Sequence, residues 1–126
     1  MAKIVFQSKT LPSTKAPYSQ AIIHENLLFI SGQIAFDPEK SGVITGTLEE
    51  ETKLTMDNIK RILEEAGSSL DKVLKVTVYL TDMKKFHKFN SIYKQYFTEE
   101  PPARSCVEVK CLPFDAKVEI EAIAHL

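Results

Sequence analysis

Apolar residues along this chain occur in short strand-like runs, which alternate with two longer segments of helical period. Four such runs lie at residues 4–7, 21–24, 27–34 and 73–80. Runs of about four to eight residues bounded by polar or turn residues are typical of β-strands. Glu25 and Asn26 separate two of the runs and predict a tight turn. The run at 73–80 is mostly apolar and rich in β-branched residues, which favours a central strand.

The first helical segment is expected from Leu48 to Ala66, after a loop rich in Asp, Pro, Ser and Gly at residues 37–46. Thr47 and Glu50 have the spacing of a capping box, and Gly67 follows as a stop signal. The apolar stripe of this helix is expected to pack on the sheet.

The second helical segment is predicted from Met83 to Phe97. Pro101 and Pro102 end this region because the residue before a proline is disfavoured in a helix. Its stripe is mostly aromatic and includes one polar residue, Asn90. The members of the stripe are Phe86, Phe89, Asn90, Tyr93 and Phe97.

The most informative segment, residues 102–124, contains two further alternating runs. Arg104 and Cys106 share one face of the first run. Glu119 and Glu121 lie on one face of the second run, opposite an apolar face. That apolar face consists of Val118, Ile120, Ala122 and Ala124.

These last two runs are predicted to pair as a hairpin. Residues 112–115 interrupt the alternation, and Pro113 cannot donate to a strand ladder. Pairing the runs would bring Arg104 close to Glu119 and Glu121. A solvated face with weak ion pairs is the ordinary interpretation of such a pattern, with Arg104 bonded to one of the glutamates.

Together the elements predict an α+β fold, with a mixed sheet and two helices packed on one face. The whole chain, residues 1–126, is expected to form a single domain, because its length is typical and no linker divides it. The uncovered sheet face would have to meet water, a ligand or another subunit.

Charge and hydropathy argue against two classes of partner. The formal net charge is -1, with Lys and Arg interspersed among Asp and Glu, so no nucleic-acid partner is indicated. The first residues turn polar too early for a signal peptide, and no run is long enough to cross a bilayer. A soluble, cytoplasmic protein without a membrane partner is expected.

The cysteines and histidines predict neither a disulfide nor a metal site. Cys106 and Cys111 are the only cysteines, and their spacing fits neither a redox pair nor a zinc site. The sequence places no histidine beside Cys106, which argues against a cysteine nucleophile. The histidines, which have no metal-ligand spacing, are His24, His87 and His125.

Three motifs, in order along nearly the full chain, resemble the RidA (YjgF) family. They are Ala16–Gln20 (APYSQ), Phe29–Ile34 (FISGQI), and the block that joins Arg104–Cys106 (RSC) to Glu119–Ala122 (EIEA). The resemblance implies a chorismate-mutase-like fold and a homotrimer with three ligand clefts between subunits. It also implies a cofactor-independent 2-iminobutanoate/2-iminopropanoate deaminase, which hydrolyses reactive enamines and imines released by pyridoxal-phosphate enzymes.

The same resemblance assigns roles to individual residues. Arg104 would anchor the substrate carboxylate, and Glu119 would activate water. The backbone N–H groups of Gly32 and Cys106 would bind the carboxylate or developing charge. The further substrate-binding residues that the resemblance implies are Tyr18, Ser31 and Asn90.

Several alternatives remain open at this point. By its chemistry alone, Asn90 fits a structural hydrogen bond to a loop better than a ligand contact. Glu121 fits a solvated carboxylate better than a catalytic one. The chain as a whole could be a non-catalytic carboxylate-sensing or protein-interaction module, because binding and hydrolysis would use the same arginine. The connection at residues 98–102 looks shorter than in many relatives, which leaves the preferred substrate size open.

Overall fold

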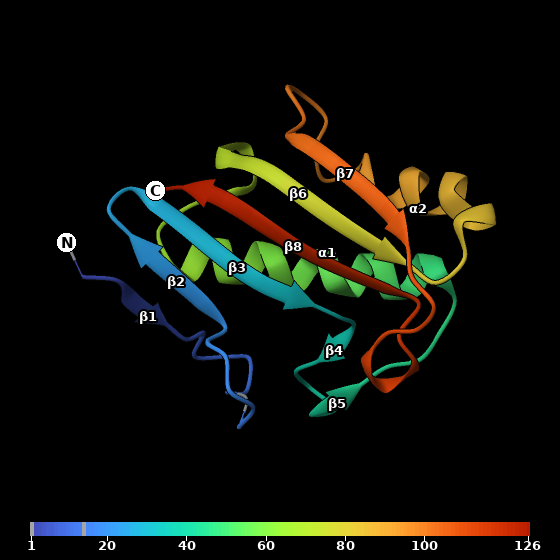
Figure 1. Cartoon of the computed structure of the whole chain (residues 1–126), viewed down its shortest axis with the longest axis horizontal. Helices are drawn as coiled ribbons and strands as arrows, with labels where there is room; N and C mark the ends of the chain where they lie inside the picture. Colours follow the sequence, from blue (N-terminus) through green and yellow to red (C-terminus); the bar gives the residue numbers. More distant parts are fainter. Residues whose placement is uncertain (1, 14) are drawn as a thin grey trace.

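Six strands form one mixed sheet, and both α-helices lie on one of its faces (Figure 1). The computed structural model describes residues 2–13 and 15–126. Only the pair β6–β7 is parallel among the neighbours of this sheet. In spatial order the strands are β1 (Ile4–Phe6), β2 (Ala21–His24), β3 (Leu27–Gln33), β8 (Val118–His125), β6 (Val73–Leu80) and β7 (Ala103–Glu108). The predicted α+β class, with a mixed sheet and two helices on one face, is confirmed.

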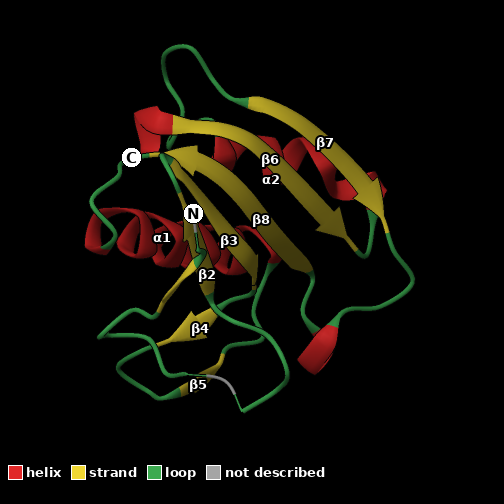
Figure 2. Cartoon of the chain, turned by 60° about the vertical axis from the view of Figure 1, so that its left-hand side comes forward, coloured by secondary structure: helices red, strands yellow, loops and turns green. Residues whose placement is uncertain are grey.

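In the described part of the chain, a small hairpin and three short 3-10 helices complete the fold. The hairpin pairs β4 (Phe36–Asp37) with β5 (Gly42–Val43) inside the segment expected to be a loop. It stands to one side of the main sheet (Figure 2). The 3-10 helices are η1 (Leu70–Lys72), η2 (Met83–Lys85) and η3 (Pro113–Asp115).

Helix α1 (Leu48–Glu65) begins at the predicted residue and ends one residue before the predicted Ala66, which is its C-cap. The Glu50 N–H donates to Thr47 Oγ1 at 3.1 Å, and the Thr47 N–H donates to Glu50 Oε1 at 2.9 Å, which completes the capping box. Gly67 follows with a φ of 88°, a conformation that glycine adopts without strain. The buried stripe of α1 packs on β3 and β8.

Helix α2 (Phe86–Tyr93) is shorter than the predicted segment. The first residues of the predicted segment form η2 instead. After Tyr93 the chain continues as a tighter turn, because the N–H groups of Gln95 and Tyr96 donate to carbonyls three residues back. The Tyr96 hydroxyl donates to Asp57 Oδ1 at 2.6 Å and so ties this end to α1. The expected aromatic stripe is present, since Phe89, Tyr93 and Phe97 are all buried.

The helices cover one face of the sheet and leave the other face uncovered. Val78 and Ile120 lie side by side on β6 and β8 under the helices and are fully buried. On the other face Phe29 is 39% exposed, and Ile123 lies directly opposite it on β8. We call this second face the open face. Within the described residues, no helix or strand of the same chain covers its apolar side chains.

The predicted hairpin between the last two strands is wrong. Strand β6 lies between β7 and β8, parallel to the first and antiparallel to the second (Figure 1). The reason is that α2 connects β6 to β7 as a crossover, which places β7 beside β6 in the same direction. Strand β8 instead fills the central gap between β3 and β6. In the described part of the chain, no helix is both long and apolar enough to span a membrane.

Candidate active site

Arg104 faces the helices, because it lies opposite the buried Val76 in the β6–β7 pair. Its Nη1 donates a 2.8 Å hydrogen bond to Oδ1 of Asn90 on α2. Its guanidinium carbon also lies within cation–π distance of three rings. The distances to the ring centroids are 4.8 Å for Tyr93, 5.4 Å for Phe86 and 5.7 Å for Phe89.

This setting overturns the expected neighbourhood of Arg104. Glu119 and Glu121 project from β8 on the open face, so the sheet itself separates them from the guanidinium. The predicted proximity, and with it the ion pair between Arg104 and either glutamate, is wrong. Asn90 and the rings hold the guanidinium in one orientation, and Asn90 thus has a structural partner. A ligand contact by Asn90 stays a prediction.

Cys106 lies two residues beyond Arg104 on the same face of β7. Burial raises the pKa of its thiol, and the nearby Arg104 charge offsets only part of that effect. The group therefore stays a protonated thiol at neutral pH, which argues against a nucleophile. The proposed role of its backbone N–H is independent of the thiol.

Glu119 lies on the open face beside Gly32. Strand β3 has a register shift between Ile30 and Gln33, and Gly32 occupies this irregular position. A Cβ on Gly32 would lie 2.8 Å from Cδ of Glu119 and closer still to Oε2. The missing side chain is therefore what allows the carboxylate to rest against this strand.

The carboxyl group of Glu119 has a raised pKa. Partial burial is the main cause, and the neighbouring Glu121 charge adds to it. Tyr79 lies opposite Glu119 on β6, and its hydroxyl donates a 2.8 Å hydrogen bond to Oε1 of Glu121. That bond raises the pKa of Tyr79. A carboxyl group with a raised pKa is a candidate for general base and acid catalysis.

Ser31 connects the loop that carries Tyr18 to β3. Its hydroxyl donates to the Ser19 carbonyl at 2.6 Å, and its N–H donates to the Gln20 carbonyl at 2.9 Å. Tyr18 as a whole remains 56% exposed. The structure thus places Tyr18, Ser31, Gly32 and Glu119 in one region, although Ser31 turns its hydroxyl to the loop.

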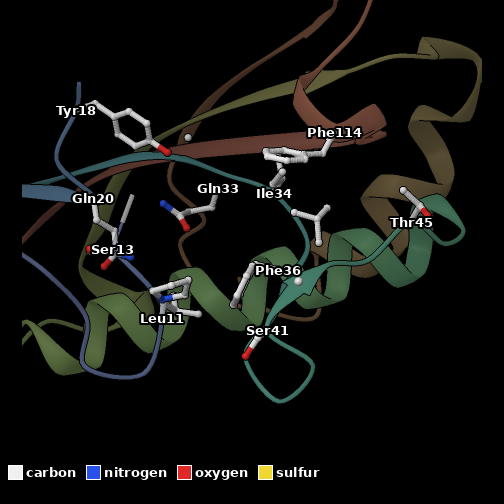
Figure 3. Close-up of a pocket in the computed structure, with 14 residues that line it drawn as sticks. Leu11, Ser13, Tyr18, Gln20, Gln33, Ile34, Phe36, Ser41, Thr45 and Phe114 are labelled. Carbon is white, nitrogen blue, oxygen red and sulfur yellow. The ribbon is translucent and has the colours of Figure 1, made fainter. Parts of the chain in front are cut away.

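A pocket of about 630 Å³ adjoins this region. Tyr18 lines it at one end, and Phe114 lines it near Ile34 (Figure 3). Gly32 is also a lining residue. All the lining residues are uncharged. A pocket of this size with mainly apolar walls and a few polar groups is the usual form of a small-molecule site.

The expected site residues therefore fall into two clusters. The arginine cluster consists of Asn90, Arg104 and Cys106, on the helix side of β7. The glutamate cluster consists of Tyr18, Ser31, Gly32 and Glu119, on the other side of the sheet. One copy of the chain does not bring the two clusters together.

Some residues of this region were not identified from the sequence. The rings around Arg104 were expected only to form an apolar stripe of the helix, although their helical spacing could be seen in the sequence. Alternation along β6 predicts the face on which Tyr79 lies, but its contact with Glu121 depends on the order of the strands in the sheet. Phe114 was expected only as a loop residue. Within residues 2–13 and 15–126, no group of three or more His, Cys, Asp or Glu side chains is arranged to hold a metal ion.

Comparisons with known proteins agree over nearly the whole chain. Residues 8–126 match the family model described as Endoribonuclease L-PSP. A RutC family protein of Pyrococcus abyssi is 50% identical over 125 residues, which cover 99% of this chain and 98% of that protein. The human 2-iminobutanoate/2-iminopropanoate deaminase is 40% identical over 120 residues, which cover 95% and 88%.

A solved structure shows the same fold. The Yersinia pestis protein YyfA, whose description places it in the conserved Rid protein family, superposes with a TM-score of 0.93 at 40% identity. The match covers 99% of this chain and 100% of that chain. This chain therefore belongs to the Endoribonuclease L-PSP family, which is the RidA family that its motifs resemble.

Proposed function

We propose that the protein hydrolyses 2-imino acids, and their enamine tautomers, to 2-oxo acids and ammonium. The observation that carries the proposal is the Glu119 carboxyl group, with its raised pKa, seated against Gly32 beside an uncharged pocket. Such a group can accept a proton from water and return it within one catalytic cycle.

The substrate class is supported by a relative and by Arg104. The human relative is named a 2-iminobutanoate/2-iminopropanoate deaminase. Both of those compounds carry a carboxylate next to the C=N carbon. An oriented guanidinium offers paired donors that match a carboxylate, and Arg104 is held in one orientation by Asn90.

The reaction needs only water and these side chains. Arg104 binds the carboxylate, and the enamine tautomerises to the imine. Glu119 takes a proton from water while the water oxygen bonds to the C=N carbon, and a proton passes to nitrogen. The C–N bond of the resulting carbinolamine then breaks. One 2-oxo acid and one ammonia leave, and the ammonia is protonated in solution.

The complete site is proposed to form between subunits of a homotrimer. The arginine and glutamate clusters lie on opposite sides of the sheet, so a substrate between them needs clusters from two copies. Phe29 and Val107 leave apolar surface exposed on the open face, which favours self-association. One copy would supply Arg104, Asn90 and Cys106, and its neighbour would supply Tyr18, Ser31, Gly32 and Glu119.

The direct test is release of 2-oxo acid when a threonine dehydratase generates the imine in situ. Wild type should accelerate release. Arg104→Ala should lose ligand binding, whereas Glu119→Gln should keep binding of 2-oxobutanoate and lose turnover. Equal activity in both variants would defeat the proposal. Binding of 2-oxo acids without any acceleration would instead indicate the carboxylate-sensing module.

Mixing the two inactive variants tests the shared site. A trimer refolded from equal amounts of Arg104→Ala and Glu119→Gln should regain activity at about a quarter of its sites, because each site needs one intact residue from each copy. Mixing either variant with itself is the control. Absence of recovery in mixed trimers would place both residues in one subunit's site.

The ribonuclease named in the family description is not supported by the charges of this chain. Lys and Arg total 16 against 17 Asp and Glu, and the pocket is lined by uncharged residues. Proteins that bind single-stranded RNA combine a positive groove with stacked aromatic side chains.

A further inference from the structure

The pocket beside Gly32 has an apolar interior that a small imino acid would leave empty. Leu11, Ile34, Phe36, Val43 and Phe114 contribute to its walls. In Figure 3, the ring of Phe114 lies over Ile34, and Leu11 and Phe36 lie at the opposite wall. Its volume of about 630 Å³ greatly exceeds that of one ethyl or methyl group.

Phe114 occupies its place in the pocket wall with a strained backbone conformation. The residue is 74% exposed, although a large apolar ring gains stability from burial. Its φ is 57°, and that of Asp115 is 58°, so two successive residues other than glycine adopt the left-handed region. Strained conformations of this kind are concentrated at binding and catalytic sites.

The pocket is also preformed, because one buried carboxylate holds two of its walls. Glu51 of α1 accepts a 2.8 Å bond from the Lys117 N–H, just after the turn that carries Phe114. It accepts a second bond of 3.1 Å from the Gly46 N–H, next to the wall residue Thr45. Glu51 is only 1% exposed, so these bonds are shielded from water.

The pocket adjoins the reacting end of the proposed site, because Gly32 belongs to both. The Glu119 carboxylate rests against Gly32, and Gly32 also lines the pocket. A substrate whose C=N carbon lies beside Glu119 can therefore extend its side chain past Gly32, between Tyr18 and Phe114.

We propose that this pocket binds the side chain of the substrate and that Phe114 sets specificity for large apolar side chains. The inference rests on the proposed function for the identity of the reacting group. The expected ligands are 2-imino and 2-oxo acids with branched aliphatic or aromatic side chains. The uncharged walls disfavour side chains that carry a charge.

Calorimetric titration of the full chain with 4-methyl-2-oxopentanoate and 2-oxobutanoate tests the proposal without requiring turnover. Wild type should bind the branched acid at least about tenfold more tightly, since added carbons are buried in an apolar pocket. Phe114→Ala should reduce that ratio to about threefold or less, because one wall is lost. Phe114→Leu, which keeps an apolar side chain, should retain most of the preference.

A second variant guards against misfolding of the strained turn. Val43→Thr keeps the shape of the wall but adds a hydroxyl, and it should also lower the preference for the branched acid. Equal affinity of wild type for both acids, binding of neither, or equal weakening of both in Phe114→Ala would overturn the proposal.

Turnover of 2-iminobutanoate separates this inference from the function on which it rests. Hydrolysis without a side-chain preference would support the deaminase function and contradict the proposed role of the pocket. A preference in binding without hydrolysis of any imine would support the role of the pocket and contradict the deaminase function.

Discussion

Gly32 and Glu119 are in direct contact across the β3–β8 pair, so that the carboxylate occupies the space that a side chain at position 32 would need. The contact is created by the register shift of β3, which leaves Gly32 out of the regular ladder. The position of the proposed catalytic carboxylate therefore depends on a neighbour that takes no chemical part in the reaction.

Gly32→Ala should reduce turnover with little loss of folding. The added Cβ would lie 2.8 Å from Glu119 Cδ, so the carboxylate must move. We expect kcat for 2-iminobutanoate to fall by at least about tenfold, because small displacements of a catalytic group are costly. Gly42→Ala is the matched control: Gly42 also lines the pocket, but its added Cβ would meet nothing closer than 3.9 Å and would not touch Glu119. Similar rates for the two alanine variants would contradict the argument.

Glu121→Gln should move the acid limb of the pH profile to lower pH. The ionised form of Glu119 is the base, so kcat/KM rises as pH passes its pKa. The Glu121 charge raises that pKa, and removing the charge lowers it. The pKa should stay above 4.5, because burial is the larger cause. Tyr79→Phe keeps the Glu121 charge and should move the limb less; identical limbs in wild type and Glu121→Gln would refute this assignment.

Glu119→Gln should be more stable than wild type at neutral pH. The folded-state pKa of Glu119 lies above its ordinary value of 4.5, so the folded protein binds the proton more tightly. Wild-type stability therefore falls as pH rises from about 4.5 through the folded pKa, and the neutral glutamine avoids this loss. Thermal unfolding at fixed protein concentration measures the difference. It should shrink as pH falls below about 4.5, and a gap that widens there would show the opposite sign.

Glu51→Ala should destabilise the fold and loosen the pocket. It removes acceptors for the N–H groups of Gly46 and Lys117, and it breaks a 3.2 Å salt bridge to Lys117 Nζ. We expect a loss of about 2–4 kcal/mol, measured by urea unfolding. Lys117→Met, which keeps both backbone bonds, should cost less because the lysine side chain is partly exposed. A larger loss in Lys117→Met would show that the salt bridge dominates.

Local patterns were sufficient to predict most of the elements. The capping box at Thr47 and Glu50 and the stop at Gly67 located α1, because capping depends on residues close in sequence. Alternation located β8, whose apolar face is buried as expected. The same approach overestimated α2, since apolar periodicity continues to Phe97 after the helix has ended at Tyr93.

Alternation in the sequence was enough to assign the residues that share a face of each strand, and the motifs indicated the family, the arginine and the glutamate. The position of β6 between β7 and β8, which puts Arg104 and Glu119 on opposite sides of the sheet, became visible only in the folded chain. Alternation could not reveal it, because it is a local property of one strand, with a period of two residues. Strand order depends instead on how the α2 crossover and the helix layer are packed, which no local pattern records.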